Sequence, residues 1–283
     1  MQENSELATF GPVKASLKFL AGTEGERVYR VGENNQQNTR HEGEFKMEEV
    51  EILNARAQPD DFTLDKNGFT LVPQPTQVKD FYQDEELKSV YDNEVRELVR
   101  KATGAARIEI FDHTRRSASN QVRAKHDVRE PASVIHNDYT AASGVNRLRD
   151  HFADTDENID NLLSGRFAIV NVWRSISGPI LSAPLALCDA QTSKPEDFVS
   201  VKRVSKERIG ELQQALYNPD QKWYYYPEMQ FDEALLIKTF DSSEAGPTRF
   251  TFHTSFELPA SDRAVATRES LETRCFVFYD TPS

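Results

Sequence analysis

The stretch that decides the fold is TRFTFHTSF, which runs from Thr248 to Phe256. Residues 249, 251, 253 and 255 carry polar side chains, whereas residues 250, 252 and 256 are all phenylalanine. Alternation with a period of two is typical of a β-strand that has one apolar and one polar face. A polar face that lines a pocket inside a barrel explains both sets of residues at once. We therefore expect a barrel strand here.

The last long strand, Arg268 to Tyr279, repeats this pattern. Its first polar face carries Arg268, Ser270, Glu272 and Arg274, and Phe276 and Phe278 continue the same face. A guanidinium cannot shed its charge and is costly to bury without an anion. Glu272 can serve one arginine, and the carboxylate of a bound molecule can serve the other in a bidentate fork.

A candidate metal site starts from the tripeptide His136-Asn137-Asp138. Residues i and i+2 of an extended segment project to the same side, so His136 and Asp138 can bind one ion together. With His253 they make the ligand set of a 2-His-1-carboxylate triad, which is associated with non-haem Fe(II) oxygenases and leaves one face of the metal open. The competing interpretation is a hydrogen-bonded loop pair and an unrelated core histidine.

The rest of the chain is predicted to be mainly β with flanking helices. Expected strands are 13–19, 107–111, 167–175, 184–188, 223–226, 234–240, 250–256 and 275–279, and residues 62–72 read as a hairpin-like element. Expected helices are 84–103, ended by Gly104, then 141–152, 155–163 and 207–217. Outside 13–19, residues 1–60 are expected to be irregular.

Composition limits the function classes. The 283 residues suit one domain, in which residues 1–105 pack on a core formed by 106–283. A net charge of -12 argues against a nucleic-acid partner. No stretch approaches the roughly 20 apolar residues of a membrane span, and no signal peptide is recognisable. Cys188 and Cys275 read as buried free thiols. We expect a cytoplasmic protein; its oligomeric state is open, with a homodimer as one option.

The chain resembles the fungal hydroxylase/desaturase family, which includes enzymes of the aspergillic acid hydroxylase and gibberellin desaturase types. The resemblance runs in order from about residue 12 to the C-terminus. The segments that carry it are IFDHTRR (110–116), HNDYT (136–140), NVWR (171–174), PLALCD (184–189), WYYYP (223–227), FDS (240–242), HT (253–254) and RESLETR (268–274).

The resemblance implies an Fe(II)- and 2-oxoglutarate-dependent oxygenase with a double-stranded β-helix core of the jelly-roll, cupin-like kind. It implies His136, Asp138 and His253 as metal ligands. Arg268 would bind the distal carboxylate of 2-oxoglutarate, with Ser270 as a second contact and Arg274 as the rival. The product would be a hydroxylated or desaturated small molecule of secondary metabolism. The alternatives are a metal-dependent cupin-type enzyme that uses no 2-oxoglutarate, and a non-catalytic jelly-roll binding protein.

Other residues carry weaker expectations. His113 is expected in a structural hydrogen-bonded pair with an aspartate, His126 in an exposed loop, and His41 and His151 at the surface. Trp173 is expected in the core, with Arg174 contacting substrate or a cosubstrate carboxylate. The aromatic run 223–226 is too rich in tyrosine to be all core, so it is expected to wall the substrate pocket. The sequence does not identify the substrate.

Overall fold

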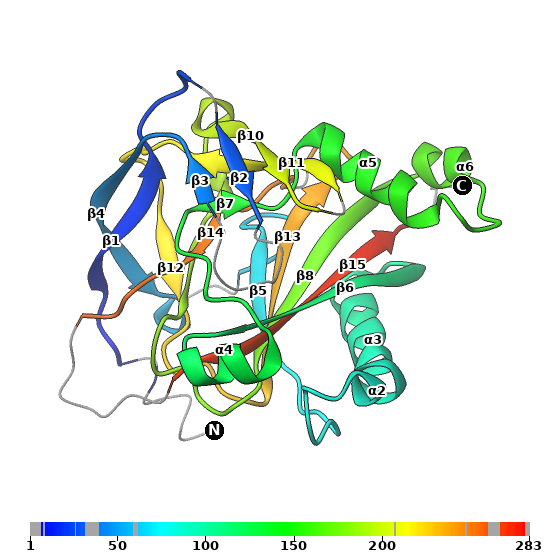
Figure 1. Cartoon of the computed structure of the whole chain (residues 1–283), viewed down its shortest axis with the longest axis horizontal. Coiled ribbons are helices and arrows are strands. Elements are labelled where there is room, and N and C mark those ends of the chain that lie inside the picture. The colour runs from blue at the N-terminus through cyan, green and yellow to red at the C-terminus, as the bar shows by residue number, and fades with distance from the viewer. Residues whose placement is uncertain are drawn as a thin grey trace.

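The computed structural model describes residues 7, 9–25, 27–31, 40–58, 62–206, 208–246, 248–259 and 267–280. Two β-sheets make up most of the molecule (Figure 1). The larger sheet has the order β1 (Val13–Leu20), β4 (Phe45–Asn54), β12 (Trp223–Tyr225), β9 (Leu185–Cys188), β14 (His253–Ser255), β7 (His136–Asn137), β11 (Ile209–Ala215), β10 (Phe198–Val204), β2 (Val28–Arg30) and β3 (Arg40–Glu42). The smaller sheet has the order β5 (Phe69–Pro73), β13 (Glu233–Asp241), β8 (Phe167–Ser175), β15 (Glu269–Phe278) and β6 (Arg107–Ser117).

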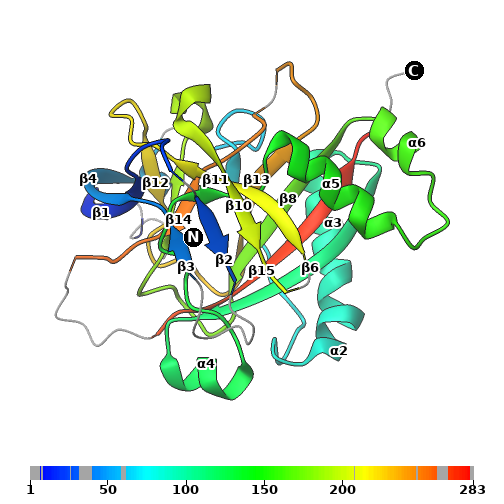
Figure 2. The same cartoon turned by 45° about the horizontal axis from the view of Figure 1, so that its top comes forward.

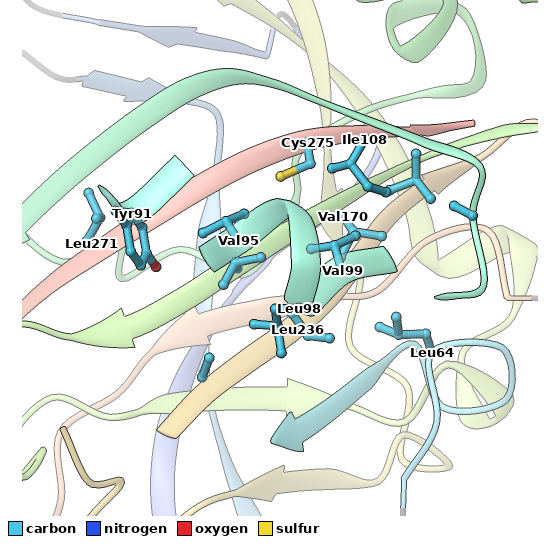
Figure 3. Close-up of a cluster of buried hydrophobic side chains, with 14 of the residues drawn as sticks. Leu64, Tyr91, Val95, Leu98, Val99, Ile108, Val170, Leu236, Leu271 and Cys275 are labelled. Carbon is cyan, nitrogen blue, oxygen red and sulfur yellow. The ribbon is translucent and has the colours of Figure 1, made fainter. Parts of the chain in front are cut away.

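Helices cover the outer face of the five-stranded sheet. A helical segment begins with α2 (Asp84–Glu86), continues through the π-helical turn Leu87–Tyr91 and ends with α3 (Asp92–Thr103). Val95, Leu98 and Val99 of α3 pack on Val170 and Cys275 of the sheet (Figure 3). Gly104 ends α3 with φ 66°, a conformation that glycine adopts without strain. The predicted helix 84–103 is confirmed.

In the described part of the chain, three further α-helices lie around the barrel. They are α4 (Asn120–His126), α5 (Ala141–Phe152) and α6 (Ile159–Ser164). Helix α5 starts with a capping box formed by Thr140 and Ser143, and its Leu148 and Phe152 close one end of the space between the sheets. The predicted bounds of α5 are confirmed; α6 begins four residues later than predicted, and α4 was not predicted. Within the described residues, no helix is long and apolar enough to cross a membrane.

The two sheets face each other across apolar side chains. Trp173 and Leu235 of the five-stranded sheet pack with Leu187 and Tyr224 of the ten-stranded sheet. The larger sheet also curls over itself, because Leu17 and Phe19 of β1 pack on Phe252 beside His253. Of the predicted strand 250–256, only His253–Ser255 is β-strand, and there the predicted division holds, with Phe252 and Phe256 in the apolar cluster and His253 on the other face.

Three expectations about secondary structure were wrong. Residues 207–217 were expected to be helical, but Ile209–Ala215 is strand β11, paired with β10 and β7; Glu207 lies outside the described residues. The Glu, Gln, Leu and Ala residues of β11 favour a helix intrinsically. Pairing with a strand on each side overrides this preference. Residues 1–60 contain strands β2, β3 and β4 in addition to β1. The charged side chains of β4 leave it largely exposed and conceal its strand pattern.

Residues 62–72 do not form a hairpin. A turn over residues 63–68 leads into β5, which pairs with β13 instead of a neighbouring strand. Gly68 has φ 85°, and a Cβ at this position would collide with the hydroxyl of Thr251. Glycine is thus required where this turn approaches the strand that carries His253.

Candidate metal centre

Strand pairing brings the three predicted metal ligands together. His136 of β7 is the direct partner of His253 in β14, so both imidazoles project from the same face of the ten-stranded sheet. Their ring centroids are 4.5 Å apart. Asp138 follows β7 directly. One potential ligand atom from each of the three residues lies within 4.8 Å of the others, as binding of a single ion requires.

Backbone carbonyls orient both imidazoles. Nδ1 of His136 lies 2.8 Å from the carbonyl oxygen of Val134, and Nδ1 of His253 lies 3.1 Å from that of Thr251. A carbonyl oxygen only accepts, so Nδ1 carries the proton and the Nε2 lone pair remains available to a metal. Burial, and then the nearby His253, lowers the pKa of His136 to about 3. The ring therefore stays neutral, as metal ligation demands.

The carboxylate of Asp138 is held by two donors on one oxygen. Its Oδ2 accepts from Nδ2 of Asn171 at 2.8 Å and from Nε of Arg274 at 3.0 Å. Its Oδ1 lies 3.7 Å from Nε2 of His136. Burial alone would raise the pKa of Asp138, but the charge of Arg274, together with the neighbouring histidines and the hydrogen bond from Asn171, outweighs it and holds this pKa well below its usual value. Asp138 is thus ionised, with Oδ1 turned toward the imidazoles.

Arg274 is surrounded by protein carboxylates. Besides Asp138, it donates to Asp112 of β6 and to Glu272 of its own strand, and Nη1 also donates to the hydroxyl of Thr114 at 3.1 Å. These partners occupy Nε and both Nη atoms. Arg274 therefore neutralises buried acids of the protein itself, which leaves it little capacity for a carboxylate from outside.

Arg268 has the opposite environment. Only 2% of it is exposed, yet within the described part of the chain no carboxylate forms an ion pair with it. Nε donates to the hydroxyl of Ser270 at 3.1 Å, Nη1 donates to the carbonyl of Ala183 at 2.6 Å, and the guanidinium lies 4.9 Å above the Trp173 ring. Burial, and then the charge of Arg116, lowers its pKa to about 9. A buried cation with only neutral partners is suited to receive an anion.

A shared carbonyl connects Arg268 with the metal-binding strand. The carbonyl oxygen of Ala183 accepts from Arg268 and also from the hydroxyl of Ser255, which lies two residues after His253 on the same face. Ala183 itself has φ 46°, a conformation that costs a non-glycine residue free energy and is found preferentially at functional sites. The Arg268 site and the metal centre therefore share one interior.

Arg174 is not brought to this interior. It lies on the face of β8 that α3 covers, where its Nη2 donates to the carbonyl of Phe231 at 2.5 Å and its guanidinium packs on the rings of Phe81 and Tyr91. The preceding residue, Trp173, points between the sheets as predicted. The expectation that Arg174 contacts substrate or a cosubstrate carboxylate is corrected, because residues that alternate along a strand face opposite ways.

The donor set fits a divalent transition metal. Two neutral imidazoles and one ionised carboxylate, each oriented by a second hydrogen bond, are the ligands of a facial triad. The two donors on Oδ2 of Asp138 favour ligation through Oδ1 alone, which keeps the remaining coordination positions free.

Comparison with known proteins agrees with this geometry. Residues 17–278 match the family model described as "Oxidoreductase/YMDC permease-like domain". The Fe(II)/2-oxoglutarate-dependent dioxygenase nvfI of Aspergillus novofumigatus is 31% identical over 91% of this chain and 92% of its own length. This chain belongs to the same family of fungal dioxygenases. The hydroxylase/desaturase CTB9 of Cercospora beticola is 31% identical over 82% of this chain and 76% of its own.

Solved structures support the dioxygenase fold. The iron and alpha-ketoglutarate-dependent endoperoxidase NvfI superposes with a TM-score of 0.82 at 27% identity, covering 96% of this chain and 99% of that one. The predicted jelly-roll fold and the prediction of a dioxygenase that uses Fe(II), 2-oxoglutarate and O2 are confirmed at the level of the family.

The other histidines of the dioxygenase lie outside the metal centre. His113 contacts Asp92 and Thr273 on the outer side of β6, so its aspartate partner comes from α3. His126 lies in α4, not in a loop, and stacks on Tyr82. His41 and His151 are half-buried, not at the surface.

Sequence reasoning missed Asn171 and Asp112, two residues that shape the candidate metal centre. Asn171 is fully buried in β8 beside Val170 and Val172, and a polar residue within such an apolar run was the available signal. Asp112 pairs with Arg274 only because β6 lies beside β15. Along the aromatic run, Trp223 and Tyr225 pack in one core cluster and Tyr224 packs in another. Tyr226 lines a small pocket with Trp173 and Met229.

Proposed function

We propose that His136, Asp138 and His253 bind the Fe(II) of this dioxygenase, and that Arg268 with Ser270 binds the distal carboxylate of 2-oxoglutarate. The observation that carries the proposal is the contrast between two arginines of one strand face. Arg274 is saturated by protein carboxylates, whereas Arg268 is more deeply buried and, among the described residues, donates only to neutral groups. An anion at Arg268 would offset the cost of its burial.

The residues around the proposed site have separate roles. Ser270 and the Ala183 carbonyl hold the guanidinium in one orientation, and Trp173 covers its face and excludes water. When bound, the metal with its cosubstrate and O2 supplies the oxidising power, and 2-oxoglutarate is converted to succinate and CO2. Asn171 and Arg274 keep Asp138 ionised and fixed throughout.

The proposed reaction is hydroxylation or desaturation of a small-molecule intermediate of secondary metabolism. Relatives carry the names hydroxylase/desaturase and endoperoxidase, so different oxidative outcomes occur on this fold. We also propose that residues 1–283 form one domain, since strands from residues 1–105 join both sheets. A cytoplasmic location and a homodimer remain predictions from the sequence.

The test is stoichiometric turnover of the purified protein with Fe(II), 2-oxoglutarate and O2. We expect succinate formation that rises with a suitable metabolite and is lost in His253→Ala. Turnover of a metabolite without consumption of 2-oxoglutarate would favour the cupin-type alternative. Failure to bind Fe(II) would favour a non-catalytic jelly-roll protein.

A further inference from the structure

An arginine projects from the same sheet face as the metal centre, several strands away. Arg203 of β10 is on the strand face that also carries the buried Val201, whereas the adjacent Lys202 is exposed on the opposite face. Its register partner in β2, which lies beside β10 (Figure 2), is Tyr29. β11 continues this face to the metal centre, because its Gln214 is the partner of His136.

Two further arginines approach from the five-stranded sheet. Arg116 of β6 is the register partner of Ser270, so it lies beside the proposed 2-oxoglutarate contacts. Arg129 forms a β-bridge with Arg116, and its carbonyl accepts from the backbone of Ser117 at 2.8 Å. Burial, and then the charge of Arg116, lowers the pKa of Arg129, and the charge of Arg203 adds to this effect. Arg116 and Arg203 therefore both lie within electrostatic reach of Arg129, and we call the three guanidinium groups the arginine cluster.

Two members of the arginine cluster, Arg116 and Arg203, carry charges that no ion pair balances within the part of the chain that the structure describes. Among the described residues, Arg116 and Arg203 form no ion pair with a carboxylate; Arg116 donates only to the carbonyl of Glu130, at 2.8 Å. The charge of Asp138 acts on Arg203, but Arg274 and Asn171 already engage this carboxylate. Arg116 and Arg203 are half-buried and cannot lose their protons, so partial desolvation and repulsion between like charges cost free energy until an anion arrives.

We propose that the arginine cluster is the subsite for a carboxylate of the organic substrate. The inference rests on the proposed function, because Arg268 is then occupied by 2-oxoglutarate and a second anion must bind elsewhere. A planar carboxylate matches the donor fork of arginine, and a carboxylate held there places the rest of the molecule along the sheet face that leads to His136. The protein as a whole has a net charge of -12, so a local group of three arginines would attract an anion selectively.

The experiment uses two probes of equal shape, 4-phenylbutyrate and its neutral amide 4-phenylbutanamide. Each is titrated by calorimetry into the full-length protein loaded with Fe(II) and saturating 2-oxoglutarate, under anaerobic conditions. We expect the carboxylate to bind at least about tenfold more tightly than the amide. Arg203→Gln should remove most of this preference. Lys202→Gln is the matched control, since it removes the same charge one residue away on the exposed face.

Binding of Fe(II) and 2-oxoglutarate to each variant separates the two proposals. If both bind normally and the wild type binds the two probes equally, the carboxylate subsite is refuted while the proposed function stands. If Fe(II) or 2-oxoglutarate fails to bind to the wild type, the proposed function fails first. An unchanged preference in Arg203→Gln would also refute the subsite. Should that variant not fold, Arg203→Lys replaces it, and the subsite predicts a weaker but persistent preference because the charge remains.

Discussion

Arg274 donates from Nε to Oδ2 of Asp138 over 3.0 Å, so an arginine of the last strand fixes the only carboxylate of the candidate metal centre. The same guanidinium contacts Asp112 and Glu272, which gives four charged groups in one partly buried network. Such a network stabilises the fold only while every member is paired. Arg274 is thus a positioning residue for the proposed metal ligand Asp138 and a structural residue at the same time.

Replacing Arg274 should affect metal binding and stability together. In Arg274→Lys the charge remains but the fork that reaches three carboxylates is lost. We expect Fe(II) affinity to fall by about tenfold or more and the free energy of unfolding to fall by about 1 to 3 kcal/mol. Isothermal titration and urea unfolding measure the two effects. Arg174→Lys is the control, because it perturbs a fully buried arginine that lies away from the metal centre. Normal Fe(II) affinity in Arg274→Lys would contradict the positioning role.

Removal of any proposed ligand should abolish metal binding without unfolding the chain. We expect His136→Ala, Asp138→Ala and His253→Ala each to lose Fe(II) and activity and to retain a cooperative thermal transition. The physical reason is that two remaining donors do not hold the ion. His113→Ala is the control, since His113 is hydrogen-bonded on the outer side of β6. Full activity in any of the three ligand variants would refute the triad.

Much of the candidate site could be predicted because it depends on local periodicity. The alternation in 248–256 and in 268–278 correctly assigned His253, Arg268 and Arg274 to inward faces, since a strand has only two faces. Periodicity could not show which of Arg268 and Arg274 pairs with protein carboxylates. Arg274 reaches Asp112 only in the observed register of β6 and β15, which includes an irregularity after Arg274. Sequence periodicity carries no information on that register.

The errors in the fold have the same origin. Strand β11 has a composition that suits a helix, and only its pairing with β10 and β7 makes it a strand. Strand β4 is rich in glutamate because much of it is exposed, so its pattern resembles a polar loop. Long-range pairing, not local preference, decides such segments.

The stability of the metal-free protein should depend on pH through His136. Its pKa is lowered to about 3 in the folded protein, by burial and then by His253, and is about 6.5 in an unfolded chain. Between these values the unfolded chain binds a proton that the folded protein does not. Stability should therefore fall as the pH decreases from about 6.5 toward 3. Urea midpoints across this range measure the effect.

In His136→Gln, the free energy of unfolding should depend less on pH than in the wild type. Identical pH dependence in the two proteins would contradict the role of His136. From the sequence alone, iron affinity is predicted to fall below about pH 6.5, where free imidazole gains a proton. The pKa of His136 is lowered in the folded protein, so protonation of His136 should begin to weaken iron binding only at a lower pH.

The carboxylate clamp gives the most direct test of the two arginines. Arg268→Lys keeps the charge but loses the fork that would hold 2-oxoglutarate, and it also loses the planar group that stacks on Trp173. We predict that the apparent Michaelis constant for 2-oxoglutarate rises at least about tenfold, or about 1.4 kcal/mol if the constant tracks binding. Fe(II) affinity should change little, because Arg268 does not contact the metal ligands. In Arg274→Lys the pattern should reverse, with weaker Fe(II) binding and a nearly normal constant for 2-oxoglutarate. Steady-state kinetics on both variants decide the matter: a normal constant for Arg268→Lys with a large rise for Arg274→Lys would transfer the clamp to Arg274.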